Sequence, residues 1–199
     1  MERALAAGVD EIRMVVSASE SHNRTNLNRP VAETLDELRA VCRLAAQRRP
    51  DVTLAGTVAT AFACPFEGRT PLERLLWVVD ELHAMGVRRI GLADTTGMAN
   101  PRQVYETVSV VRERFPDVTF WLHLHNTRDL ALANAWPGCK RGSVISTVPL
   151  AAWAGAPSPL VRPATSPPRI WSTCSTRWAS KRASTWMPCS QWDASCAMP

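Results

Sequence analysis

Two histidines one residue apart are the feature of this sequence that most suggests chemistry. His123 and His125 lie in the stretch WLHLHNT (121–127), whose composition is typical of a β-strand. Side chains at positions i and i+2 of a strand point to the same side, so the two imidazoles should face together, with Leu124 opposite. Two imidazoles placed in this way can bind one metal ion. Two partly buried histidines satisfied by hydrogen bonds are the alternative interpretation.

Polar residues also follow three other predicted strands. They stand in the stretches SASESHN (17–23), CPFEG (64–68) and ADTTG (93–97). Asp94, at the end of its strand, is a candidate catalytic acid–base or a carboxylate beside the metal site, and its alternative role is to cap the following loop. Glu20 and Thr95 are candidates for substrate contacts, although Glu20 and Glu67 can equally be solvated loop carboxylates. Cys64 is most simply a small buried residue.

Alternating strand and helix patterns must position these residues. Runs rich in β-forming residues cover 11–16, 52–60, 88–94 and 118–125; helical periodicity marks 31–47, 71–86 and 100–115, and another helix starts at 129–135. Pro30, Pro71 and the pair Asn100 and Pro101 are typical of helix starts, and Gly86 is typical of a helix end. The alternation predicts parallel strands joined by right-handed crossovers, in a doubly wound sheet or a segment of a (β/α)8 barrel. No glycine-rich phosphate loop follows any strand, so the dinucleotide-binding fingerprint is missing.

Charge is divided unevenly along the chain, whose formal net charge is +5. Residues 1–134 contain 16 Arg, no Lys and 17 acidic residues, whereas residues 135–199 contain 7 basic residues and one acid, Asp193. The positive excess is confined to the C-terminal part, which argues against a nucleic-acid-binding face on the folded domain. No apolar run is long enough for a membrane span, and the N-terminus lacks a signal-peptide pattern, so we expect a cytoplasmic location. The six Cys include no C-x-x-C pair, so neither a zinc site nor a redox motif is expected.

Four motifs, in a fixed order, carry a resemblance to a known family. They are SASESHN, ACPFEG, GLADTTGMANPRQV, and HLHNTRD followed by ALAN, each just after a predicted strand. Together they resemble the hydroxymethylglutaryl-CoA lyase family, within the larger group of metal-dependent barrel lyases and acyl-CoA condensing enzymes, over nearly all of residues 1–134. The sister synthases, which make isopropylmalate, homocitrate or citramalate, usually show H-x-H-N-D, whereas this chain has His125, Asn126 and Thr127. CPFEG also looks lyase-like, so the resemblance favours a lyase, with a synthase as the alternative.

The resemblance implies an α/β fold, a partial (β/α)8 TIM barrel with about strands four to seven. It implies an acyl-CoA thioester substrate and a divalent metal, Mg²⁺ or Mn²⁺, with His123 and His125 as two ligands and Asp94 as a catalytic carboxylate beside them. The implied reaction cleaves 3-hydroxy-3-methylglutaryl-CoA to acetyl-CoA and acetoacetate, with the metal as Lewis acid. Intact family members are expected to be homo-oligomers. The family's other metal ligands, an Asp on the first strand and an Asn in a late GN motif, have no match here, nor does its catalytic Cys.

A change of composition near residue 135 divides the chain into a partial lyase domain, 1–135, and a tail, 136–199. The tail holds nine of the fifteen Pro and six of the eight Trp, and it has almost no acidic residues and no sustained periodicity. Reading its back-translation two bases later from Leu150 permits the family motif G-G-L-G-G-C-P. We interpret the tail as an irregular, disordered out-of-frame translation, with a divergent natural tail as the alternative. On this interpretation the chain as written is catalytically incomplete; a non-catalytic truncated product is the corresponding alternative function.

Overall fold

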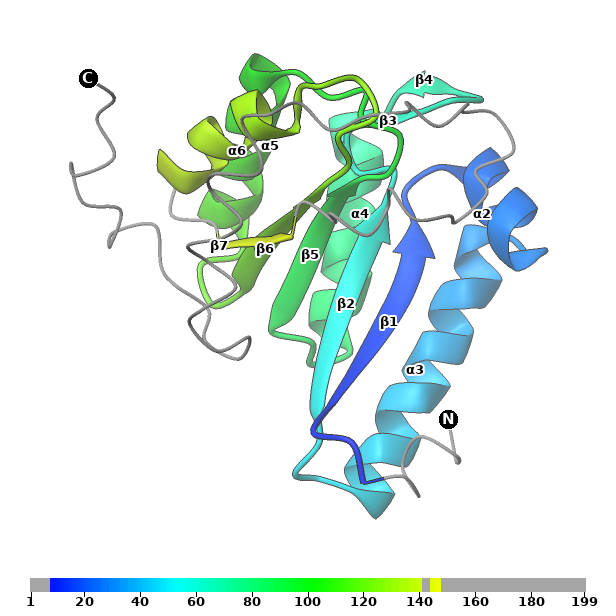
Figure 1. Cartoon of the computed structure of the whole chain (residues 1–199). Coiled ribbons are helices and arrows are strands. Elements are labelled where there is room, and N and C mark those ends of the chain that lie inside the picture. The colour runs from blue at the N-terminus through cyan, green and yellow to red at the C-terminus, as the bar shows by residue number, and fades with distance from the viewer. Residues whose placement is uncertain (1–7, 141–143, 148–199) are drawn as a thin grey trace.

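A parallel sheet with helices against one face forms the centre of the computed structural model, which describes residues 8–140 and 144–147. The strands are β1 Glu11–Ser17, β2 Thr53–Ala59, β3 Ala63–Cys64, β4 Gly68–Arg69, β5 Arg89–Asp94, β6 Thr119–Leu124 and β7 Val144–Thr147. The helices are α2 Glu20–Leu27, α3 Val31–Arg48, α4 Leu72–Ala84, α5 Pro101–Arg114 and α6 Ala131–Lys140. The main sheet has the order β1-β2-β5-β6-β7, and β3 pairs with β4 in a separate short hairpin (Figure 1).

Local sequence signals explain where the helices begin and end. The side chain of Asn100 accepts a hydrogen bond from the backbone N–H of Gln103, and Pro101 occupies the first position of α5. Gly86, just past the end of α4, has a φ of 89°, a left-handed conformation that glycine adopts without steric penalty. The predicted start of α5 and the predicted glycine at the end of α4 are therefore confirmed.

The core lies between the sheet and its helices. Alternation along β1 shows the layering, because Met14 and Val16 are buried whereas Arg13 and Val15 are exposed. The largest fully buried side chains come from both layers, and they include Val16, Val58, Ile90, Leu92, Phe120, Leu122 and Leu124 of the strands and Val31, Leu75, Val78 and Leu82 of the helices. Burial of this apolar surface drives the folding of the unit. We call the opposite face of the sheet, which carries Arg13 and Val15, the inner face.

Two elements were not predicted from the sequence. The polar stretch after β1 forms the helix α2, where Ser19 is the N-cap and accepts a hydrogen bond from the backbone N–H of His22. The CPFEG stretch forms the turn of the β3-β4 hairpin. Neither segment has the apolar periodicity from which helices and strands were predicted. Within the described part of the chain, no helix is both long and apolar enough to cross a membrane.

The four adjacent parallel strands predicted over residues 11–125 are present, and regular structure continues beyond them. Helix α6 runs through Pro137 to Lys140, and β7 pairs with β6 in parallel. Residue 136, where the irregular tail was predicted to begin, therefore lies inside a helix. Packing of α6 against α5 and β6 outweighs the helix penalty of Pro137, which the sequence pattern alone did not reveal. The rest of the tail, 141–143 and 148–199, lies outside the described residues, so its interpretation stays a prediction.

Candidate active site

His123 and His125 lie together at the carboxyl end of β6. Their Nε2 atoms are 3.0 Å apart, and their ring centroids are 4.8 Å apart with the rings at 76° to each other. The strand register aligns Val15 of the inner face with Thr57 of β2, and Thr57 with Gly91 of β5. Gly91 aligns in turn with Trp121 of β6, which lies two positions before His123 and therefore on the same face. The two imidazoles, which we call the His pair, therefore project from the inner face, and their predicted common orientation is confirmed.

The geometry and protonation of the His pair suit a divalent metal. Two nitrogens bound at right angles to one ion, each about 2.1 Å from it, are about 3 Å apart. Burial lowers the pKa of both imidazoles, and the charges of His125 and Arg13 lower the pKa of His123 further, so both rings are neutral near pH 7, the form that binds metals. The alternative interpretation, a hydrogen bond between the Nε2 atoms of two neutral imidazoles, is compatible with the same separation of 3.0 Å. No group of three or more His, Cys, Asp or Glu side chains in the described ranges could hold a metal, so these ranges supply two imidazole ligands.

The carboxylate of Asp94 lies in the loop between β5 and α5. It is fully buried and accepts hydrogen bonds from the backbone N–H groups of Met98 at 3.0 Å and Ala99 at 3.1 Å. Burial raises the pKa of Asp94, and the loop N–H groups partly oppose this shift. In register Asp94 aligns with Leu124, whereas His123 aligns with Ala93, so strand alternation puts Asp94 on the face opposite the His pair. The observed contacts of the carboxylate match the loop-capping alternative, and the expected catalytic role of Asp94 beside the metal ligands stays a prediction.

The loop that Asp94 closes packs against the His pair. The backbone N–H of His125 donates to the carbonyl oxygen of Asp94 at 3.3 Å. Gly97 in this loop has a φ of 65°, and a Cβ there would lie 3.0 Å from the carbonyl oxygen of His125 and 3.2 Å from Thr127. Asp94 therefore acts on the His pair through the backbone, by holding the loop that supports His125.

Thr95 connects two strand ends. Its Oγ1 accepts a hydrogen bond of 2.8 Å from the backbone N–H of Thr60, which follows β2. Thr60 has a φ of 51°, a conformation that is costly for a β-branched residue. Its Oγ1 in turn accepts from the backbone N–H of Ser19 at 3.3 Å. These contacts give Thr95 a structural role at the carboxyl edge, in addition to its candidacy for substrate contact.

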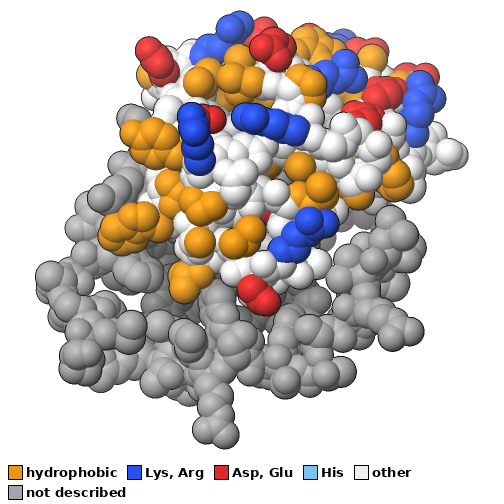
Figure 2. Space-filling model, turned by 90° about the horizontal axis from the view of Figure 1, so that it is seen from above, with side chains coloured by type: hydrophobic (Ala, Val, Ile, Leu, Met, Phe, Trp, Pro, Cys, Tyr) orange, Lys and Arg blue, Asp and Glu red, His pale blue; other side chains and the backbone are white. Residues whose placement is uncertain are grey.

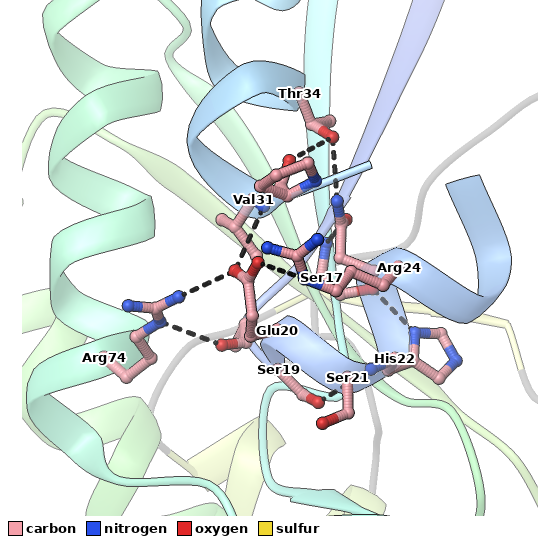
Figure 3. A network of polar contacts seen from close by, with 12 residues as sticks. Ser17, Ser19, Glu20, Ser21, His22, Arg24, Val31, Thr34 and Arg74 are labelled. Atoms are coloured by element: carbon pink, nitrogen blue, oxygen red, sulfur yellow. Dashed lines mark hydrogen bonds and ion pairs between the residues drawn. The ribbon is translucent and has the colours of Figure 1, made fainter. Parts of the chain in front are cut away.

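Glu20 stabilises the start of a helix (Figure 3). Its carboxylate lies 2.9 Å from Nε of Arg24 and 3.3 Å from an Nη atom of Arg74, and it accepts a hydrogen bond of 3.1 Å from the backbone N–H of Val31, the first residue of α3. Pro30, which precedes α3, provides no side-chain cap, so Glu20 supplies the acceptor that this helix end lacks. These contacts give Glu20 a structural role that does not require a substrate.

Sequence reasoning missed a serine–histidine pair at the end of β1. The Oγ atom of Ser17 lies 2.7 Å from Nδ1 of His22 (Figure 3). Burial lowers the pKa of His22, and the charge of Glu67 partly opposes this shift. Glu67 itself accepts a hydrogen bond of 2.6 Å from the backbone N–H of Ser21, which joins the β3-β4 hairpin to α2. The missed signal was the close spacing of Ser17 and His22 within SASESHN.

A charged cluster on the inner face was also missed. Glu11 lies 2.7 Å from Nε of Arg13 and 2.5 Å from Nη1 of Arg89. The guanidinium of Arg13 lies 5.6 Å from the ring centroid of Trp121. Trp121 occupies the space above Gly91, where a Cβ would lie only 2.4 Å from the indole ring. The period-two spacing of Glu11 and Arg13 could have revealed that they share a face.

Two surface cavities lie away from the predicted site residues. One of about 260 Å³ is lined by residues of α4 and α5, including Leu72 and Gln103, and one of about 330 Å³ lies at the other end, against Arg49 and Arg88. None of the predicted site residues lines either cavity. Viewed from above in Figure 2, charged side chains of both signs mix with apolar ones on the described part of the surface. The candidate site is the inner face around the His pair, whose two imidazoles are partly buried.

Comparison with known proteins places this arrangement in a family. The family model described as HMGL-like matches residues 1–148. The (R)-citramalyl-CoA lyase of Chloroflexus aurantiacus is 42% identical over 142 residues, which are 71% of this chain and 44% of that protein. A hydroxymethylglutaryl-CoA lyase of Bacillus subtilis is 35% identical over 145 residues, which are 73% of this chain and 48% of that protein. The chain thus spans about half the length of the curated relatives it matches.

Solved structures of hydroxymethylglutaryl-CoA lyases have the same fold. The enzyme of Acinetobacter baumannii, in complex with coenzyme A and 3-methylmalate, matches with a TM-score of 0.67 and 34% identity over 75% of this chain and 51% of that one. The enzyme of Bacillus subtilis matches with a TM-score of 0.67 and 34% identity over 74% of this chain and 52% of that one. The predicted partial (β/α)8 barrel is confirmed by these likenesses. The chain belongs to the HMGL-like family, the family of hydroxymethylglutaryl-CoA and citramalyl-CoA lyases that break carbon–carbon bonds.

Proposed function

We propose that this chain carries part of the active site of a metal-dependent lyase that cleaves a 3-hydroxyacyl-CoA thioester, with 3-hydroxy-3-methylglutaryl-CoA as the first substrate to test. The observation that carries the proposal is the 3.0 Å separation of the His123 and His125 Nε2 atoms on the inner face. The site lies at the carboxyl ends of parallel strands, where barrel enzymes place their chemistry. Mg²⁺ and Mn²⁺ are the proposed metals.

The names of the relatives support a substrate with one free carboxylate. Hydroxymethylglutaryl-CoA and citramalyl-CoA are both thioesters of hydroxy dicarboxylic acids, in which one carboxyl group forms the thioester and the other stays ionised. The Acinetobacter baumannii structure contains 3-methylmalate, which is also a hydroxy dicarboxylate. We therefore propose this substrate class for the site, and citramalyl-CoA is the second thioester to test.

The described residues have distinct proposed roles in this chemistry. His123 and His125 would hold the cation through Nε2, and a bound divalent cation supplies Lewis acidity toward the hydroxyl and carbonyl oxygens of a substrate. Cleavage removes the hydroxyl proton and breaks the carbon–carbon bond, and its electron pair passes to the thioester enolate, which is protonated to acetyl-CoA. Asp94 is proposed as a positioning residue for His125, because both of its oxygens accept loop N–H groups.

Acting alone, the 199-residue chain is proposed to be inactive. Its described sheet is open, with β1 and β7 at the edges, so the inner face is not enclosed as in a closed barrel. The described residues offer two neutral imidazoles, whereas Mg²⁺ prefers oxygen ligands. Incubation of the chain with 3-hydroxy-3-methylglutaryl-CoA and Mg²⁺ should release no acetoacetate. Acetoacetate above the level of a His123→Ala control would contradict this proposal.

A chimera tests the proposed function itself. Residues 8–147 of this chain would replace the aligned segment of the Bacillus subtilis lyase, and acetoacetate release would be measured. We expect turnover that His123→Ala abolishes and that His83→Ala preserves, because His83 lies at the surface, 2.9 Å from Asp117. A chimera that folds, as shown by circular dichroism and cooperative unfolding, but has no turnover would contradict the proposal.

A further inference from the structure

Helix α6 is tied to the two loops that flank His125. The backbone N–H of Ala131, the first residue of α6, donates to Oδ1 of Asn126 at 3.1 Å, and Asn126 directly follows His125. About one turn further along α6, Nδ2 of Asn134 donates to the carbonyl oxygen of Ala99 at 3.0 Å. Ala99 belongs to the loop between β5 and α5. Ala131 and Asn134 are both fully buried, so they lie on the same, inward face of the helix.

A continuous path of contacts leads from Asn134 to the backbone of His125. The N–H of Ala99, whose carbonyl oxygen Asn134 binds, donates to Oδ2 of Asp94 at 3.1 Å. The carbonyl oxygen of Asp94 accepts a hydrogen bond from the N–H of His125 at 3.3 Å. In the same loop, a Cβ at Gly97 would lie 3.0 Å from the carbonyl oxygen of His125. Both the N–H and the carbonyl group of His125 are therefore in contact with the loop that Asn134 holds.

The side chain of Asn134 is only half satisfied. Its Oδ1 atom is buried and has no hydrogen-bond partner among the described residues. A buried amide oxygen without a partner destabilises a fold, because it has lost its hydrogen bonds with water. This cost offsets the gain from the bond between Nδ2 and Ala99, so the net contribution of Asn134 to global stability is small. What the asparagine provides is the local attachment of the loop at Ala99 to α6.

We propose that Asn134 is a positioning residue that fixes the backbone of His125, and with it Nε2 of that ring, through the loop between β5 and α5. This inference rests on the proposed function, because the position of the ring matters for a cation held by the His pair. The two Nε2 atoms lie 3.0 Å apart, so a movement of His125 changes the distance and angle at which its ring meets the cation. Groups that orient a metal ligand without touching the metal typically change the metal affinity roughly 10- to 100-fold.

An anchor for helix α6 is the competing explanation. Asn134 would then stabilise the packing of α6, and its loss would lower the thermal stability of the chain with no specific effect on His125. Asn134→Leu separates the two explanations, because leucine has nearly the shape of asparagine but no donor. The substitution removes one unpaired buried acceptor, Oδ1 of Asn134, and creates another, the carbonyl oxygen of Ala99. We therefore expect little change in the thermal unfolding midpoint.

The test makes two measurements on the 199-residue chain. The first is amide hydrogen exchange followed by NMR, without metal. The N–H of His125 should exchange faster in Asn134→Leu than in the wild-type chain, whereas the amides of β2, which lies between β1 and β5, should keep their rates. The second is a Mn²⁺ titration followed by broadening of the His123 and His125 ring signals. Asn134→Leu should bind Mn²⁺ roughly tenfold more weakly than the wild-type chain.

Thr34→Val is the matched control. Like Asn134→Leu, it replaces a buried polar side chain by an apolar one of the same shape, but Thr34 lies in α3, away from the loop. Its Oγ1 accepts a hydrogen bond of 2.8 Å from Nδ2 of Asn23 and donates to the carbonyl oxygen of Pro30 at 3.1 Å. Thr34→Val should lower the thermal unfolding midpoint at least as much as Asn134→Leu. It should keep the wild-type exchange rate at His125 and the wild-type Mn²⁺ affinity.

Three results would overturn the assignment of Asn134: wild-type exchange at His125 in Asn134→Leu, wild-type Mn²⁺ affinity in that variant, or equal effects in Thr34→Val. If Asn134→Leu does not fold, Asn134→Ser carries the comparison, because its hydroxyl is too short to reach the carbonyl oxygen of Ala99. A wild-type chain that does not bind Mn²⁺ rejects the metal-dependent lyase, and the exchange rate of His125 alone then decides on Asn134. Mn²⁺ binding that Asn134→Leu leaves unchanged rejects the Asn134 assignment alone.

Discussion

Gly97 stands directly against the backbone of His125: a Cβ at Gly97 would lie 3.0 Å from the His125 carbonyl oxygen. Gly97 also has a φ of 65°, where an L side chain costs about 1–2 kcal/mol. We predict that Gly97→Ala lowers the free energy of unfolding by at least this amount, because the conformational strain and the contact with His125 add. Urea unfolding measures the stability, and the His125 NMR signals should shift.

Gly68 provides the matched control. Its φ is 75°, and nothing lies within 4 Å of the position that its Cβ would occupy. Gly68→Ala should therefore carry the conformational cost alone and leave the His125 signals in place. Equal losses of stability in the two variants, with unshifted His125 signals in both, would show that Gly97 does not support the His pair.

The Asp94 carboxylate predicts a dependence of stability on pH. Burial raises its pKa above the ordinary 3.8, so the folded state binds more protons than the unfolded state in the interval between these values. The contribution of Asp94 to the free energy of unfolding is therefore highest below pH 3.8 and decreases as the pH rises through the interval. Asp94→Asn should remove this decrease and cost about 1–3 kcal/mol at neutral pH, because an amide provides one oxygen for two loop N–H groups. Denaturation of both proteins across this pH range is the measurement; parallel pH profiles would contradict the prediction.

Three histidines predict that stability depends on pH in the opposite sense, so that it decreases as the pH falls. Burial holds the pKa values of His22, His123 and His125 below the ordinary 6.5, so below pH 6.5 the unfolded chain binds more protons than the folded one. Stability should therefore decrease as the pH falls below 6.5. His22→Gln should reduce this decrease, since it removes one of the three groups. Urea midpoints at about pH 7.5 and about pH 5.5 test this; an unchanged difference between the midpoints in the variant would contradict the burial assigned to His22.

Glu20 should prove to be a structural residue. Its contacts with Arg24, Arg74 and the N–H of Val31 are partly exposed, so Glu20→Gln should cost about 1 kcal/mol of unfolding free energy. The exposed pair of Glu37 with Arg29 is the control, and Glu37→Gln should cost almost nothing. If Glu20→Gln left stability unchanged but weakened thioester binding, the substrate-contact interpretation would be the correct one.

The sequence predicted the layers of the fold because its signals are local. Apolar and polar residues alternate along EIRMVV and WLHLH, and apolar residues recur at helical spacing in the three long helices. These local patterns determine which side chains face the core. Helix α2 escaped prediction because its stability comes from the Ser19 cap and from ion pairs such as Glu20 with Arg24, and no apolar stripe marks it. The continuation of α6 past residue 135 depends on packing against α5 and β6, which a local pattern does not reveal.

The site was predicted only as far as spacing determines it. His123 and His125 belong to one strand, so period-two alternation was enough to bring their rings together. The direction of Asp94 depends on its register with Leu124, and the contact of Arg13 with Trp121 depends on the order of the strands in the sheet. Both are consequences of tertiary structure that spacing along the chain does not contain.

Mn²⁺ binding to the His pair tests the central claim most directly. Mn²⁺ titrated into the 199-residue chain should selectively broaden the NMR signals of His123 and His125, and either His123→Ala or His125→Ala should abolish the effect on the remaining ring. His83→Ala should behave like the wild-type chain, because His83 lies apart from the pair, in contact with Asp117. Uniform broadening that includes His83, or selective broadening that survives His123→Ala, would contradict a metal site formed by the His pair.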